Sequence, residues 1–171
     1  MNLLLKGQLA IGDIPFAVQA GLRQRADGLL ELPFCPQVHN HLQTVHASAQ
    51  FTLAETASGM FLHQQFPALA PHVLPVLRSS ETTFRKPATS GLTAYPSIRE
   101  ADISTFETTL HRKGFALIKV SVTVKNEEGA ATLTGRFIWF VQTRAEQLRT
   151  NNISTNHLTQ NVLNNSHGAS S

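Results

Sequence analysis

The sequence has few of the residues and motifs that mark several common classes of protein. Its single cysteine, Cys35, excludes an intramolecular disulfide and a cysteine-based zinc cluster, and suits a reducing compartment, so the cytoplasm is the expected location. There is no Gly-x-Ser-x-Gly nucleophile elbow and no Gly-rich phosphate loop, and Cys35 stands between two prolines without a nearby basic motif. We therefore do not expect serine or cysteine hydrolase chemistry.

Runs of one charge sign and long apolar runs are also missing. Fourteen Lys and Arg against eleven Asp and Glu give a net charge of +3. Because the basic residues form no cluster, this balance does not indicate nucleic-acid binding, but it is compatible with an anionic small molecule. The leucines in residues 1–6 make too short a run for a signal peptide or a membrane span. We expect a soluble protein with no nucleic-acid or membrane partner.

The composition divides the chain near residue 145. With 171 residues, 42% hydrophobic and 15% charged, the chain fits one domain with a sizeable core. Beyond Arg144, Asn, Ser, Thr, Gln and His predominate, and such a segment cannot bury enough apolar surface to offset the entropy of ordering. The sequence predicts a domain over residues 1–145 and a polar, flexible tail over residues 146–171.

A long buried helix is predicted over residues 45–63. This segment has no proline and only one glycine, Gly59, and Thr44 or a neighbour is expected as its N-cap. Apolar residues lie round most of its circumference, which is typical of a helix enclosed by other structure. Glu55 is the one carboxylate in this segment, and a buried carboxylate is costly unless it is paired, hydrogen-bonded or protonated. Glu55 is therefore the main candidate for function.

Strand patterns occur on both sides of this helix. Residues 13–22 and 29–34 flank the turn-forming pair Asp27-Gly28 and predict a first hairpin. After the helix, three prolines mark a loop, which is followed by a predicted strand over residues 76–84 and another over 92–98. These prolines are Pro67, Pro71 and Pro75.

The second half of the chain carries the clearest patterns. Residues 101–113 have apolar side chains at helical spacing and end at Gly114, which predicts a short surface helix. Residues 118–125 and 133–141 alternate apolar and polar side chains about the turn at 126–129, which predicts a long β-hairpin. The predicted fold class is α+β, with an antiparallel sheet of five to six strands wrapped round the long helix.

The start of the helix resembles the helix motif of the hotdog-fold thioesterases, especially the phenylacetate-pathway type. That motif has an Asn, a short Gly-containing loop, a His, two small residues and then Leu-Ala-Asp or Leu-Ala-Glu. The sequence departs from the motif at Gln43, where Gly is usual, and at Ala47-Ser48, where Gly-Gly is frequent. The motif positions occur in order and spacing: Asn40, Thr44, His46, Ala47, Ser48, Leu53, Ala54 and Glu55.

A second similarity lies downstream, in Phe84-Arg85-Lys86-Pro87-Ala88 followed by Gly91-Leu92-Thr93-Ala94. With the predicted strands, the resemblance covers roughly residues 10–143. It implies the hotdog fold and the hydrolysis of an acyl-CoA or acyl-carrier thioester without a cofactor.

Thioester hydrolysis needs a base or nucleophile near the carbonyl carbon and donors aimed at the carbonyl oxygen. The resemblance implies Glu55 as general base or nucleophile, with Asn40 and His46 as positioning groups. The backbone N–H groups of Val45, His46 and Ala47 could receive the oxyanion, because the helix dipole also favours negative charge there.

The same residues have simpler interpretations. Glu55 could be a structural carboxylate bound to Thr52, Thr56 or a backbone group, and either Asn40 or His46 could be a cap or loop-ordering residue. A histidine cluster also precedes the helix, but it has no Cys or carboxylate beside it and matches no zinc spacing, so no metal is expected. The cluster consists of His39, His41 and His46.

Several basic side chains are candidates for the phosphates of coenzyme A, although most of them are expected to be solvated surface charges. They are Arg78, Arg85, Lys86, Lys113 and Arg136.

Two other functions are open for the same fold. A hotdog dehydratase pairs a histidine with a helix carboxylate, and His41 with Glu55 could form such a pair, but the Pro- and Gly-rich segment that usually precedes that helix is absent. Alternatively, the chain could be a non-catalytic domain that binds an acyl ligand, in which Glu55 only fixes the loop.

The exposed edges of such a sheet predict a homodimer or a dimer of dimers. In hotdog families, sheets join edge to edge and each site is completed by the neighbouring subunit. By that resemblance, Glu55 of one chain would face the loop of residues 39–46 of the other.

Overall fold

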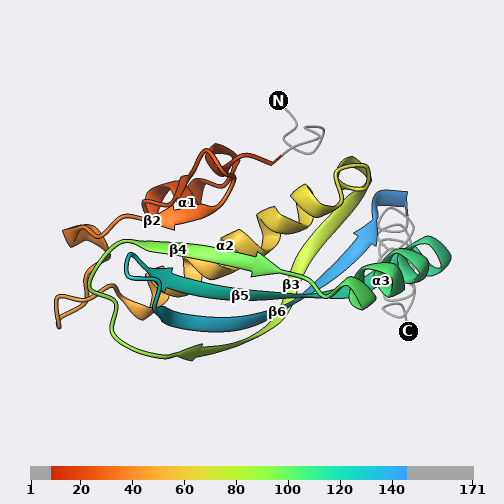
Figure 1. Ribbon diagram of the computed structural model, residues 1–171. Coiled ribbons are helices and arrows are strands. Elements are labelled where there is room, and N and C mark those ends of the chain that lie inside the picture. Colours follow the sequence, from red (N-terminus) through yellow and green to blue (C-terminus); the bar gives the residue numbers. More distant parts are fainter. Residues whose placement is uncertain (1–8, 146–171) are drawn as a thin grey trace, which may run out of the picture.

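The computed structural model describes residues 9–145, which form an antiparallel sheet around one long helix (Figure 1). The strand order is β1-β2-β4-β5-β6-β3, so β1 and β3 are the two edges. This confirms the predicted hotdog arrangement. The elements are α1 (Pro15–Gln19), β1 (Arg23–Gln24), β2 (Leu30–Leu32), α2 (Ala47–Gln65), β3 (Val73–Phe84), β4 (Leu92–Ser97), α3 (Glu100–Lys113), β5 (Phe115–Asn126) and β6 (Ala131–Thr143).

The helix α2 is the centre of the fold, as the sequence predicts. No side chain between residues 49 and 63 is exposed, so the helix is covered on all sides. Five strands of the sheet, β2 to β6, and α1 pack against it, and Leu53 and Ala54 are fully buried beneath them. Its N-cap is His46, two positions after Thr44.

The β5–β6 hairpin is the longest part of the sheet and confirms the alternating pattern. In β5 the even-numbered residues from Ala116 to Val124 are buried, and in β6 the odd-numbered residues from Leu133 to Val141 are buried. Successive side chains of a strand point to opposite faces, so one face of the hairpin packs on α2. Phe137 lies fully buried on this face.

The predicted surface helix is α3, which ends at Gly114 with a φ of 75°, a left-handed conformation that favours glycine. The short strand β4 pairs with β2 on one side and, on the other, with residues 121–126 in the second half of β5. α3 packs beside the remaining first half of β5, where β4 has already ended. Its buried Phe106 reaches the C-terminal end of α2, where it contacts Phe66 at a ring separation of 5.0 Å.

The N-terminal part differs from the predicted hairpin. Residues 15–19 form the helix α1 instead of a strand, because Pro15 at its first position supplies a helical φ and lacks only an N–H that the helix would not use. The turn at Asp27-Gly28 is where it was predicted, but it joins the short strands β1 and β2.

The edge strand β3 begins at Val73 and includes Pro75, which the sequence places in a loop. A proline is tolerated at an edge because its missing N–H can face away from the neighbouring strand. The pairing of β3 with β6 shifts its register between Leu77 and Ser79, so Arg78 lies at a bulge. The other side of β3 has no strand partner in the described chain.

Candidate functional site

Glu55 lies in the middle of α2 and is half-buried. Among residues 9–145 it forms no ion pair, and its one side-chain hydrogen bond comes from the Thr56 hydroxyl, 3.5 Å from Oε2. Burial raises the pKa of the Glu55 carboxyl above its ordinary value, and the bond from Thr56 opposes this shift. A carboxylate with a raised pKa is a stronger base, so Glu55 is suited to take a proton from water.

The side of α2 that carries Glu55 faces β6. Phe51, one turn before it, packs against Phe137 with ring centroids 5.9 Å apart. One turn after it, the Ser58 hydroxyl accepts a hydrogen bond of 3.0 Å from the indole of Trp139. Because residues three and four apart share a helix face, Glu55 lies between these two contacts. It therefore faces the half of the sheet that ends at the free edge of β3.

Asn40 holds its own loop. Its Oδ1 accepts hydrogen bonds from the N–H groups of Leu42 and Thr44 at 2.9 and 3.1 Å, and from the Thr44 hydroxyl at 3.2 Å. Its Nδ2 donates to the Thr44 hydroxyl oxygen at 2.9 Å. The loop carries Gln43 with a φ of 59°, a left-handed conformation that costs roughly 1–2 kcal/mol for a residue with a Cβ. Asn40 thus stabilises the position at which the thioesterase motif has glycine.

The helix start offers fewer free donors than the sequence suggests. His46 caps α2, because its Nδ1 accepts a hydrogen bond from the Ser48 N–H at 3.0 Å. The N–H of Val45 is donated to the Ala88 carbonyl at 2.8 Å, and that of His46 to the Val38 carbonyl at 2.7 Å. Both amides are therefore already used.

Ala47 is the remaining candidate of the three predicted oxyanion donors. Within the described residues its N–H has no hydrogen-bond partner, and Ala47 is exposed at the first turn of α2. Its N–H also lies at the positive end of the helix dipole. This amide can still receive an anionic oxygen.

Ala47 and Glu55 are too far apart to act on one thioester within a single chain. At a rise of about 1.5 Å per residue, about 12 Å of helix separates them. A catalytic donor must lie about 3 Å from the oxygen, and the base acts on the adjacent carbon. A complete site therefore needs donors other than those at the start of the same helix.

An open cleft of ≈520 Å³ lies beside the helix start. One wall comes from α1, through Phe16 and Gln19, and the other from the first turns of α2, through Ser48 and Thr52. The sequence did not reveal the contribution of α1, because residues 13–22 were predicted as part of a hairpin. The remaining lining residues are Ala20, Gly21, Cys35, Gln37, Val38, His39, His46 and Ala49.

The three predicted loop histidines have different surroundings. His39 packs against Phe34 with ring centroids 4.3 Å apart, and its buried Nε2 has no partner in the described structure. His41 is exposed, and His46 is the helix cap. Among residues 9–145, no three His, Cys, Asp or Glu side chains lie together as metal ligands would. None of the helices in this part of the chain has the length and hydrophobicity of a membrane span.

The basic candidates divide into two groups. Arg85 and Arg136 line a groove of ≈370 Å³ on the face of the sheet opposite α2. There Arg85 donates to the Thr134 hydroxyl at 3.2 Å, and Arg136 forms an exposed ion pair of 2.8 Å with Glu81. Arg78, at the bulge of β3, and Lys86, in the following loop, are exposed outside this groove, and so is Lys113 at the end of α3. Of the five basic candidates, only Arg85 and Arg136 line the same groove.

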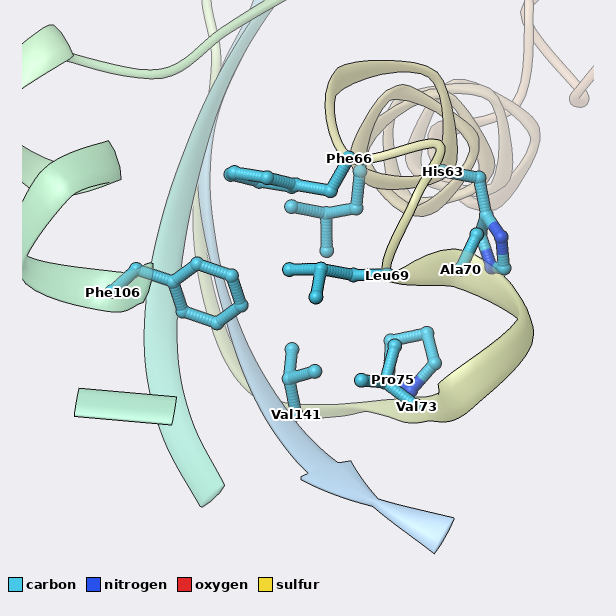
Figure 2. Close-up of a pocket in the computed structure, with 9 residues that line it drawn as sticks. His63, Phe66, Leu69, Ala70, Val73, Pro75, Phe106 and Val141 are labelled. Atoms are coloured by element: carbon cyan, nitrogen blue, oxygen red, sulfur yellow. The ribbon is translucent and has the colours of Figure 1, made fainter. Parts of the chain in front are cut away.

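A small apolar cavity of ≈20 Å³ lies at the other end of α2 (Figure 2). Phe66, Leu69, Phe106 and Val141 point toward one another there; the first two follow the end of α2, and the others come from α3 and β6. His63 also lines the cavity; its buried Nδ1 has no partner in the described chain, and burial lowers its pKa. In the sequence, the one feature that could have indicated this cavity is His63, a histidine among apolar residues near the end of the predicted helix. The other lining residues are Leu62, Ala70, Val73 and Pro75.

Comparison with known proteins identifies a family. The model of the family described as Domain of unknown function (DUF4442) matches residues 22–141, which include α2 and all but the last residues of the sheet. Among curated proteins, none matches the chain.

Several solved structures share this fold. A protein from Pseudomonas aeruginosa, described as of unknown function and a probable thioesterase, is 22% identical, with a TM-score of 0.69 over 78% of this chain and 91% of its own. A protein from Bacillus halodurans determined with CoA is 26% identical, with a TM-score of 0.58 over 74% of each chain. A thioesterase from Staphylococcus aureus is 16% identical, with a TM-score of 0.56 over 75% of this chain and 98% of its own.

The structures of the staphylococcal protein carry substitutions. In one, alanine replaces a glutamine, and in another, alanine replaces a glutamate fifteen positions later.

Proposed function

The chain belongs to the DUF4442 family, and on that premise we propose that it hydrolyses the thioester of an acyl-CoA or an acyl-carrier protein. The observation that carries the proposal is Glu55, a half-buried carboxylate in the centre of a hotdog fold that has no ion pair with any of residues 9–145. A carboxylate in this position has a structural cost that a neutral residue would avoid. A catalytic role accounts for that cost.

Glu55 acts on the carbonyl carbon in one of two ways. As a general base it takes a proton from water, the water oxygen attacks the carbonyl carbon, and the C–S bond breaks as the proton passes to the leaving thiolate. As a nucleophile it attacks the carbon directly, and water then hydrolyses the resulting anhydride. Turnover in ¹⁸O-water separates the two routes, because only the nucleophilic route places label in the Glu55 carboxyl.

The oxyanion would be received by the Ala47 N–H of a second subunit. This follows from the separation of about 12 Å along the helix, which prevents Ala47 from serving the same thioester as Glu55 of its own chain. The free edge of β3 lies on the side that Glu55 faces, so a partner docked there would lie next to Glu55. Asn40 and His46 would position the helix-start loop of that partner.

The comparisons support a CoA thioester as substrate. The Bacillus halodurans protein was determined with CoA, and the staphylococcal protein is described as a thioesterase. Asn40 precedes Glu55 by fifteen positions, the same separation as the two substituted residues of the staphylococcal protein. Arg85 and Arg136 are the basic pair that could contact the CoA phosphates, since they share one groove.

The test is a panel of acyl-CoAs of increasing chain length, assayed for release of free thiol. We expect hydrolysis that depends on Glu55 and is unchanged in His41→Ala, since His41 is exposed and has no role in this mechanism. Binding without thiol release would instead indicate a non-catalytic acyl-binding domain. Hydration of an enoyl-CoA that is lost in His41→Ala would indicate a dehydratase.

A further inference from the structure

Trp139 is the one tryptophan of the chain and is buried between β6 and α2. Its indole N–H donates to the Ser58 hydroxyl at 3.0 Å, and that hydroxyl donates to the backbone carbonyl of Glu55 at 2.7 Å. Two hydrogen bonds thus connect the indole to the helical turn that carries Glu55.

The indole also lies directly against the helix backbone at Gly59. A Cβ at this position would lie 2.9 Å from Cη2 and 3.0 Å from Cζ2 of Trp139, closer than side chains normally approach. Gly59 therefore allows the ring to pack directly against the helix backbone, where a side chain at position 59 would collide with it.

Two contacts and then a cavity follow one another along α2 and β6. Phe51 meets Phe137, then Ser58 and Gly59 meet Trp139, and then the apolar cavity of Figure 2 follows, which Leu62 and Val141 line. Glu55 lies between the Phe51 and Ser58 contacts, whereas the cavity follows the contact with Trp139. The indole therefore separates Glu55 from the cavity.

We propose that Trp139 is a specificity-determining residue that limits the length of the acyl group. The inference rests on the proposed thioesterase function, in which the acyl group extends from Glu55 along the face between α2 and β6. The ring stops this group before it reaches the cavity at the C-terminal end of α2. A smaller side chain at position 139 opens the way past the ring to this cavity and admits a longer acyl chain.

The experiment compares wild type with Trp139→Leu and Trp139→Phe on saturated acyl-CoAs of increasing length. Each further methylene that becomes buried should improve binding about fourfold. We expect the ratio of kcat/KM for long over short acyl-CoAs to rise at least tenfold in Trp139→Leu, and by less in Trp139→Phe. The phenylalanine variant keeps most of the packing and carries the test if the leucine variant does not fold.

Phe106→Leu is the matched control. Phe106 lines the far wall of the cavity, so the substitution enlarges the cavity without opening the passage past Trp139. The ratio of long-chain to short-chain kcat/KM should not change in this variant. A rise equal to that of Trp139→Leu would show that cavity volume, and not the indole, sets the length limit, and would overturn the proposal.

A second readout separates this inference from the proposed function. The binding of the same acyl-CoAs is measured by calorimetry, with Glu55→Gln added to each variant to prevent turnover. If wild type releases thiol but neither Trp139 variant changes its length preference, the inference fails and the function stands. If no thiol is released but the variants bind longer acyl-CoAs better, the function fails and the length limit stands. The absence of any length-dependent binding overturns the inference.

Discussion

The two ends of α2 lie in opposite environments. The N-terminal end carries a polar loop ordered by Asn40, a histidine cap and an open cleft of ≈520 Å³. The C-terminal end closes over an apolar cavity of ≈20 Å³ between Phe66 and Phe106. A thioester has the same asymmetry, with a polar carbonyl and head group at one end and an apolar acyl chain at the other. In the proposed shared site, such a substrate would have its carbonyl at the polar end of α2 from one subunit and its acyl chain along the apolar half of α2 from the other.

The two titratable residues of α2 that burial perturbs show the same contrast. Burial raises the pKa of Glu55 and lowers that of His63, so both side chains are shifted toward their neutral forms. Glu55 lies half-buried on the face of α2 that meets β6, whereas His63 lines the apolar cavity. We expect Glu55 to be catalytic and His63 to be a packing residue.

The largest expected effect comes from Glu55→Gln. Loss of a general base should lower thioester hydrolysis by roughly 10²–10⁴-fold, while the melting temperature stays the same or rises, because a neutral amide avoids the cost of burying a charge. Steady-state thiol release and thermal unfolding measure the two quantities. Glu107→Gln, at an exposed position of α3, is the control and should change neither. Turnover of Glu55→Gln near that of wild type would remove Glu55 from the mechanism.

A smaller effect, partial recovery of thioester hydrolysis, is expected when two inactive variants form a mixed dimer. In that dimer the helix-start loop of one subunit meets the intact Glu55 of the other. Glu55→Gln and Asn40→Ala chains, each inactive alone, are co-expressed with different tags. A mixed dimer then holds one intact site and one doubly altered site, so a statistical mixture should recover about a quarter of wild-type activity.

Light scattering at micromolar concentration checks the assembly itself. The same two substitutions placed in one chain provide the control, because mixing it with itself restores no site. A monomeric protein, or mixed dimers without activity, would show that the site is not shared between subunits.

A smaller effect concerns the pH dependence of the unfolding free energy. The raised pKa of Glu55 contributes stability that is present below about 4.5 and is lost as the pH rises through the raised value. The lowered pKa of His63 contributes stability that is present above about 6.5 and is lost as the pH falls through the lowered value. Glu55→Gln should remove the first loss, and His63→Gln the second.

Urea unfolding from about pH 4 to about pH 8 measures both slopes. His72→Gln, at an exposed position, is the control for the histidine. If His63→Gln leaves the acid side of the profile unchanged, burial does not control the charge of this histidine.

The smallest expected effect is that of the C-terminal tail, which lies outside the described residues. Deleting residues 148–171 should leave the melting temperature nearly unchanged, because their composition offers little apolar surface to bury. A loss of many degrees would show that residues beyond 145 pack on the domain and contribute to the environments of α2.

The sequence predicted the elements whose patterns are local. The continuous apolar circumference of residues 45–63 predicted a buried helix, and the period of two in β5 and β6 predicted their hairpin. The predicted end of α3 at Gly114 is also correct, because the left-handed conformation there favours glycine.

Features that depend on distant residues were not predictable in the same way. Pro75 reads locally as a strand breaker, and only the position of β3 at the sheet edge makes it acceptable. The amides of Val45 and His46 are used by carbonyls of Ala88 and Val38, which no local pattern reveals. Likewise, the contact between Gly59 and Trp139 joins residues 80 positions apart and depends on the packing of α2 on β6.

The free edge of β3 has a consequence for hydrogen exchange. Along an edge strand, only every second backbone amide can point to the neighbouring strand, here β6, and the alternate amides point away from it. In an isolated chain, deuterium should therefore enter β3 in an alternating pattern of fast and slow positions. When a second subunit pairs along the same edge, the fast set becomes protected as well, and β3 then exchanges as slowly as an interior strand.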